Sequence, residues 1–277
     1  MRKTILCLIF LLLLLPIGKA EEADIKVSVT FLNVGKADAI LLDIGSCTYL
    51  IDTGTKQSYD RLYAALCERG TQEIEAVFIT HTDKDHVGGL NKLSKSGIKI
   101  KAVVTSAFCA DEENGKHPCD KACTRLGIEL QRLKAGDVYE LVSGCRMEVV
   151  SPFVLRDDEN DNSLAMRLVT PQGNVFFAGD MEEEAEEILY KSGAGDMEAC
   201  LLKVAHHGRN DATSAWLLSQ VKPSAAVICT DTAEDARTAA PEVIQRLKQA
   251  GAQVYLTQDY EKGITFELGE LAVSSVQ

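Results

Sequence analysis

The chain has 277 residues, of which 46% are hydrophobic, and a formal net charge of −12 at pH 7. This length allows one or two domains with a sizeable core, and the composition excludes a disordered or repetitive chain. The acidic balance argues against a protein that grips nucleic acid through many phosphate contacts, because such proteins carry basic surfaces.

The first twenty residues have the pattern of a secretory signal. A basic start, Arg2-Lys3, precedes an apolar stretch over 4–15 that ends at Pro16, and small residues follow at Gly18 and Ala20. The apolar stretch is too short for a comfortable membrane span. We expect residues 1–20 to be cleaved and residues 21–277 to be secreted, with an uncleaved anchor as the alternative. Without residues 1–20 the chain has 26 basic and 41 acidic residues, a net charge of −15.

Short apolar runs and amphipathic stretches predict strands and helices in two successive halves. The predicted strands are 26–32, 38–44, 47–52, 75–80, 99–104, 137–141, 145–150, 164–170, 174–179, 199–205, 224–229, 253–257 and 262–267. The predicted helices are 57–69, 90–94, 118–126, 182–192, 213–220 and 239–250. The acidic residues that open helix 182–192 complement its dipole and are expected to face solvent.

One segment, His-Thr-Asp-Lys-Asp-His-Val-Gly-Gly over 81–89, follows the predicted strand 75–80. Imidazoles and carboxylates are ligands of divalent first-row metals, and His81, Asp83, Asp85 and His86 lie within six residues. A polar turn with incidental histidines is the alternative. The two carboxylates between the histidines, and the glycine pair that ends the segment, favour a metal-binding loop.

Three more predicted strands end in side chains of the same kind. Asp52 ends one, Asp180 follows Gly179 after another, and His206 and His207 follow a third. Taken singly, each aspartate is typical of a turn and each histidine of a hydrogen-bonded core residue. Their occurrence in this order favours a shared metal site.

These motifs resemble the metallo-β-lactamase superfamily and, more narrowly, the soluble hydrolase domain of ComEC-type DNA-uptake proteins. The resemblance covers about residues 26–275 and implies an α/β fold, the single-domain αββα sandwich. The segments that carry it are Asn33-Val34-Gly35-Lys36-Ala37-Asp38-Ala39, Leu50-Ile51-Asp52-Thr53-Gly54, 81–89, Asn162-Ser163-Leu164, Gly179-Asp180 and Leu202-Lys203-Val204-Ala205-His206-His207-Gly208.

The chain also departs from the family pattern. The subfamily usually begins with Asp-Val-Gly-Gln-Gly-Asp, and this chain has Asn33, Lys36 and Ala37 in that stretch. The small Ser that usually follows His-His-Gly is Arg209. The superfamily's further histidine has one candidate, His117, which we leave out as a polar residue of an exposed loop. The segment Asp-Asn-Ser over 161–163 occupies the position in the chain where the family has this histidine.

The resemblance implies two divalent metal ions, Zn²⁺ or Mn²⁺, and assigns their ligands. One ion would take His81 and Asp83, the other Asp85, His86 and a histidine of the pair His206-His207, with Asp180 bridging. Asp83 in place of a histidine makes one site richer in oxygen, which suits Mn²⁺.

Two further assignments concern single residues. His206 ranks ahead of His207 because strand alternation places it on the same face as Leu202 and Val204. Asp52, Asp85 and Asp180 are the candidate catalytic carboxylates, and Asp52 would orient a ligand.

Eight cysteines remain without residues 1–20, an even number in a chain expected to be exported. Oxidising conditions favour disulfides, and we expect one or two among Cys109, Cys119, Cys123 and Cys145, around a cysteine-bearing insertion near 105–125. Cys200 and Cys229, inside apolar strands, are candidate free thiols, and a structural zinc on Cys119, Cys123 and His117 is the alternative to the disulfides.

A pair of divalent ions can generate hydroxide at neutral pH and clamp a phosphodiester. The sequence therefore predicts an exported dinuclear metal-dependent hydrolase, a phosphodiesterase or nuclease that acts on DNA or other phosphodiesters. We expect a monomer that forms no stable nucleic-acid complex and, after signal cleavage, does not contact a membrane. The alternatives are a cell-wall or lipid phosphodiester (phosphocholine-type) esterase and, from another class, a non-catalytic secreted binding module on a hydrolase scaffold.

Overall fold

The computed structural model describes residues 25–112, 115–193 and 195–276, so the expected signal over 1–20 lies outside the described residues. Within those ranges no helix combines the length and the apolar character that a membrane crossing needs.

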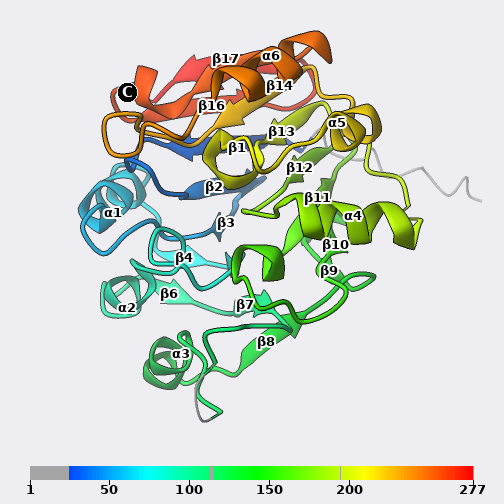
Figure 1. Ribbon diagram of the computed structural model, residues 1–277. Helices are drawn as coiled ribbons and strands as arrows, with labels where there is room; N and C mark the ends of the chain where they lie inside the picture. The colour runs from blue at the N-terminus through cyan, green and yellow to red at the C-terminus, as the bar shows by residue number, and fades with distance from the viewer. Residues whose placement is uncertain (1–24, 113–114, 194, 277) are drawn as a thin grey trace, which may run out of the picture.

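Two large sheets form the body of the molecule (Figure 1). The first has the order β17 (Ala272–Ser275), β16 (Gly263–Glu267), β1 (Val27–Leu32), β2 (Ile40–Ile44), β3 (Cys47–Ile51), β5 (Val77–Ile79), β7 (Val103–Ser106), β8 (Leu130–Leu133). The second has the order β15 (Gln253–Leu256), β14 (Ala225–Ile228), β13 (Leu201–Lys203), β12 (Val175–Phe177), β11 (Ala165–Val169), β10 (Arg146–Ser151), β9 (Val138–Glu140). The short strands β4 (Glu73–Ile74) and β6 (Lys99–Ile100) pair separately.

Helices cover the outer face of each sheet. The first sheet packs against α1 (Tyr59–Glu68), α2 (Leu90–Leu93) and α3 (Asp120–Leu126), and the second against α4 (Glu183–Ser192), α5 (Ala215–Val221) and α6 (Pro241–Gln249). Figure 1 shows α1, α2 and α3 together along one side of the sheets. The fold is thus the predicted αββα sandwich.

Side-chain alternation along buried strands explains the layers. In β2, Ile40 and Leu42 point into the core between the sheets, whereas Leu41 packs in the layer beneath the helices. Strands buried on both faces need apolar residues at every position, and such runs are what made them visible in the sequence.

The cysteines do not form the disulfides we expected, because all eight described thiols are free. Cys119 and Cys123 are buried in the layer between the first sheet and its helices. Cys145 is buried in the core between the two sheets. Cys145 therefore lies on the opposite side of the first sheet from the insertion, and burial in apolar surroundings accounts for these three thiols without a bridge.

Candidate metal centre

Four strands deliver the candidate ligands to one edge of the sandwich. β3 runs parallel to β5, and β12 runs parallel to β13, so in each pair the carboxyl ends lie side by side. Asp52 directly follows β3, the loop that starts at His81 follows β5, Asp180 follows β12 and His207 follows β13. The first sheet and the second sheet each supply part of the site.

Asp52 holds the orientation of His86. One carboxylate oxygen of Asp52 accepts hydrogen bonds from the Thr80 hydroxyl and from Nδ1 of His86, each at 2.8 Å, and the other accepts the Thr80 backbone N–H. Asp52 is fully buried. With the proton on Nδ1, the His86 Nε2 lone pair faces Asp180, where a metal ligand needs it.

Four candidate ligand atoms, from Asp180, His86, His207 and Asp85, are linked by short contacts. The Oδ2 of Asp180 lies 3.2 Å from Nε2 of His86 and 3.1 Å from Nε2 of His207, and this His207 atom lies 3.3 Å from Oδ2 of Asp85. The His207 Nε2 is buried and has no hydrogen-bond partner among the described residues, whereas Nδ1 donates to the Cys229 carbonyl. Tetrahedral ligation at about 2.0–2.1 Å places ligand atoms about 3.3 Å apart, which is the spacing of these three contacts. Ligand atoms of Asp85, His86 and His207 also lie within 4.8 Å of one another, so this group could hold a divalent ion.

His81 and Asp83 form the second, less complete group. The Nε2 of His81 is buried and without a hydrogen-bond partner among the described residues, and it lies 3.9 Å from a carboxylate oxygen of Asp83. Ligand atoms of His81, His86 and Asp180 lie within 4.8 Å of one another. The Asp83 side chain is 46% exposed, so this group opens to solvent.

The pKa values at the centre reflect burial and a surplus of carboxylates. Burial, reinforced by the nearby His86, lowers the pKa of His81 to about 3, so its imidazole is neutral at pH 7. Burial also opposes the charged forms of His86 and His207, but the surrounding carboxylates, Asp180 foremost, together outweigh it and raise both pKa values. A divalent ion would take the place of these two protons.

His206 belongs to a different network, so our ranking of His206 ahead of His207 is wrong in this geometry. The His206 Nδ1 lies 3.0 Å from Asp211 and 3.1 Å from Glu182, and its Nε2 lies 3.0 Å from the Arg209 guanidinium. Both histidines have left-handed backbone torsions, with φ of 45° and 52°. Strand alternation ends at Lys203, and the turn that follows directs His207 instead of His206 to the centre.

Two buried groups beside the centre, Lys203 and Glu159, were not predicted from the sequence to have a role there. The Lys203 ammonium contacts Asp38 at 2.5 Å and the Oδ1 of Asp180 at 3.1 Å, and these carboxylates raise its pKa although burial opposes this. The signal for Lys203 was available, because a lysine interrupts an apolar strand run there.

Glu159 is the other unassigned group. It accepts hydrogen bonds from the Thr82 backbone and hydroxyl and from the Ala110 backbone, which fixes the loop between His81 and Asp83. Glu159 lies in a polar stretch of the sequence that gave no such signal.

Two more expectations change in the structure. His117 is buried instead of exposed, and its Nδ1 accepts the Cys119 backbone N–H. Among the described residues, none of the groups that could hold a metal ion includes a cysteine or His117. Ser163, in the segment that stands in place of the missing histidine, accepts a hydrogen bond from the Asp180 backbone N–H and so positions that carboxylate.

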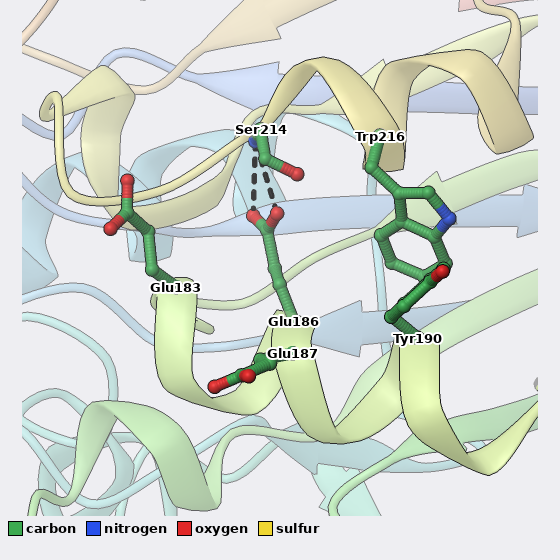
Figure 2. A pocket seen from close by; sticks show the side chains of 6 residues that line it. All are labelled: Glu183, Glu186, Glu187, Tyr190, Ser214 and Trp216. Carbon is green, nitrogen blue, oxygen red and sulfur yellow. Dashed lines mark hydrogen bonds between the residues drawn. The ribbon is translucent and has the colours of Figure 1, made fainter.

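The acidic face of α4 borders a separate cavity of about 550 Å³, which also reaches Tyr190 and Trp216 (Figure 2). Glu186 is buried, contrary to the expectation that these acidic residues face solvent. Its carboxylate accepts the backbone N–H groups of Thr213 and Ser214, as Figure 2 shows for Ser214, and so caps the start of α5. The charge of Glu186 therefore serves the fold.

The protein is an αββα sandwich that brings histidines and carboxylates from both sheets together at one edge. This combination of fold and side chains defines a class of proteins with a site for divalent metals. Residues 32–232 match the family described as the Metallo-beta-lactamase superfamily, and the chain belongs to that superfamily. Its donor set and its family together place it among the metal-dependent hydrolases of the superfamily.

The relatives at the sequence level include an operon protein and a competence protein. The chain is 24% identical over 267 residues to ComE operon protein 3 of Bacillus subtilis, an alignment that covers 90% of this chain and 33% of that protein. Competence protein ComA of Neisseria gonorrhoeae is 22% identical, with 90% of this chain and 33% of that protein covered. The chain thus spans about a third of the length of these curated relatives.

Among solved structures, the metallo-beta-lactamase fold protein YhfI of Bacillus subtilis superposes with a TM-score of 0.58. The alignment covers 88% of this chain and 99% of that one at 11% identity. A likeness at this identity establishes the fold, and it agrees with the family match.

Proposed function

We propose that this chain is an exported metal-dependent phosphodiesterase that acts on DNA or on another phosphodiester. The observation that carries the proposal is the grouping of Asp85, His86, Asp180 and His207. Three contacts of 3.1–3.3 Å link them: Asp180 to His86, Asp180 to His207 and His207 to Asp85. Each histidine of this group has its Nδ1 on a buried acceptor, which leaves Nε2 for a ligand role. When bound there, divalent ions lower the pKa of water and stabilise charge on a phosphoryl group.

Neighbouring residues of the chain orient the candidate ligands and neutralise their charge. Asp52 keeps a proton on Nδ1 of His86, and the Cys229 carbonyl does the same for His207. Lys203 holds Oδ1 of Asp180, so that Oδ2 of the same carboxylate faces the two histidines. Preorganised charges of this kind do not have to rearrange during a reaction, which is why they favour hydrolysis over simple binding.

The substrate class rests on the relatives. One relative is named a competence protein and another a recombination protein, which favours nucleic acid. Because the surface is strongly acidic, we propose transient contact with DNA by a monomer, with no stable complex and no membrane contact. The acidity also supports a second candidate, hydrolysis of a wall or lipid phosphodiester of the phosphocholine type.

The test begins with elemental metal analysis of the purified protein. Hydrolysis of bis(4-nitrophenyl) phosphate is then measured with Mn²⁺, with Zn²⁺ and with a chelator. We expect activity that the chelator abolishes and that Asp85→Ala reduces at least a hundredfold. The control is Asp60→Ala, because this α1 carboxylate is 86% exposed. Equal rates for wild type and Asp85→Ala would contradict hydrolysis at this site, and no hydrolysis by either protein would leave the non-catalytic binding module.

The substrate is then chosen with a panel of single- and double-stranded DNA, RNA, a phosphocholine ester and a cephalosporin. Turnover of DNA above the other compounds supports the leading proposal. Turnover of the phosphocholine ester alone supports the second candidate, and turnover of the cephalosporin alone contradicts both.

A further inference from the structure

Lys36 directs an ammonium group at the candidate metal centre. It lies in the loop between β1 and β2, and its Nζ is 2.5 Å from Oδ2 of Asp85. The Lys36 side chain is 18% exposed, so most of its length is covered. Surface lysines are normally mobile and solvated, which makes this placement unusual for a residue with no assigned role.

Backbone contacts fix this loop on the metal-binding loop. The Asp38 N–H donates to the Asp85 carbonyl at 3.1 Å, and the Gly54 N–H donates to the Asp38 carbonyl at 2.7 Å. The Lys36 N–H donates to a carboxylate oxygen of Glu234 at 2.9 Å. The approach of the Lys36 amine to Asp85 is therefore set by the fold and does not depend on a free side-chain excursion.

The two lysines at the centre differ in the oxygen that each one contacts. Lys203 contacts Oδ1 of Asp180 and leaves Oδ2 toward the histidines. Lys36 contacts Oδ2 of Asp85, which is the oxygen that faces Nε2 of His207 at 3.3 Å. Lys203 thus supports a ligand from behind, whereas Lys36 contacts the same carboxylate oxygen that an ion at this site would need.

We propose that Lys36 sets the metal affinity of the site formed by Asp85, His86, Asp180 and His207, because its ammonium competes with the divalent ion for Asp85. This inference rests on the proposed function, since it concerns the same site. Like charges a few ångströms apart repel strongly at the edge of a protein interior. The chain therefore binds an ion at this site more weakly than its four donors alone would.

The test is a metal titration of the metal-free protein with Mn²⁺ and with Zn²⁺, in competition with a chromogenic chelator, together with elemental analysis of stoichiometry. Lys36→Gln removes the charge and keeps a polar side chain, and we expect it to tighten binding at least tenfold. Lys36→Arg retains the charge and is expected to bind within about threefold of wild type. Thermal melts verify that each variant is folded.

The matched control is Lys84→Gln, which removes one positive charge from an exposed side chain next to Asp85. We expect its affinity to remain close to that of wild type. The inference is overturned if Lys36→Gln binds equally or more weakly, or if Lys84→Gln tightens binding as much as Lys36→Gln does.

The two proposals fail in different ways. If neither wild type nor any variant takes up metal, the proposed function fails together with this inference. If all of them take up metal with the same affinity, the proposed function stands and only the role of Lys36 is rejected.

Discussion

His206 and His207 are neighbours in the chain but serve different networks. His207 faces Asp85 and Asp180, and its other ring nitrogen is held by a backbone carbonyl. His206 is surrounded by Glu182, Asp211 and Arg209. Each imidazole is therefore fixed in orientation, and only one of the two offers a buried lone pair to the centre.

We predict that His207→Ala impairs metal binding and that His206→Ala leaves it nearly unchanged. His207→Ala removes one of four converging ligand atoms and should weaken metal binding at least a hundredfold, whereas His206→Ala should change it by less than about fivefold. Competition with a chromogenic chelator measures both affinities. Equal losses in the two variants would contradict the assignment of His207.

Lys203 supports the other side of the same carboxylate cluster. Its ammonium is almost completely buried between Asp38 and Asp180. Removing one partner of a buried ion pair leaves an uncompensated charge, which typically costs about 3–5 kcal/mol of stability.

We predict that Lys203→Met lowers the free energy of unfolding by about 3–5 kcal/mol in the presence of a chelator. Metal should restore part of this loss, because a divalent ion also neutralises Asp180. Denaturant unfolding measures both values. The control, Lys191→Met, removes an exposed ion pair with Glu187 on α4 and should cost less than about 1 kcal/mol. Similar losses in the two variants would show that Lys203 is not a structural charge.

At the scale of elements, each ligand is placed by the way its strand ends. Asp180 follows Gly179, whose φ of +57° turns the chain out of β12. A Cβ at Gly179 would lie 2.8 Å from Cβ of Ser163, the residue whose hydroxyl accepts the Asp180 N–H. This glycine therefore permits both the turn after β12 and the close approach of the segment that precedes the neighbouring strand β11.

We predict that Gly179→Ala lowers both stability and metal affinity. The positive φ alone costs about 1 kcal/mol, and the crowding against Ser163 adds about 1–3 kcal/mol. Gly193→Ala is the matched control, since Gly193 has a φ of +66° but a Cβ at that position would meet open space. Only Gly179→Ala should reduce the affinity for Mn²⁺ in the chelator titration. An unchanged affinity would show that the turn tolerates a side chain without moving Asp180.

The elements differ in how well the sequence predicts them. All thirteen expected strands are present, with the range 99–104 divided between β6 and β7. These strands are mostly buried on one or both faces, so their apolar runs stand out. β8 and β17 lie at the edges of the first sheet and are largely or wholly exposed, and therefore carry no such run. Pattern and periodicity mainly report burial, and these two exposed strands leave little trace in the sequence.

At the scale of the whole molecule, the centre joins the two sheets. Asp52 and the 81–86 loop come from the first sheet, and Asp180 and His207 come from the second. The sequence alone predicted that these residues lie together, because candidate ligands follow the ends of successive predicted strands. The contact of Lys36 with Asp85 could not be read in the same way, because it joins two loops through a long side chain.

This arrangement predicts that metal binding stabilises the whole fold. An ion held by residues of both sheets has no equivalent site in the unfolded chain, so its binding free energy adds to the stability of the folded state. At a free metal concentration one hundred times the dissociation constant, the gain is about 2.7 kcal/mol. For a chain of this size, that gain raises Tm by about 5–10 °C.

Thermal melts followed by circular dichroism, first with a chelator and then with Mn²⁺ or Zn²⁺, measure this shift. His207→Ala removes a ligand on the second sheet and His86→Ala removes one on the first, so each should lose most of the metal-induced rise. If metal raised the Tm of His207→Ala as much as that of wild type, the ion would be held by the first sheet alone. The stabilisation would then have nothing to do with joining the two sheets.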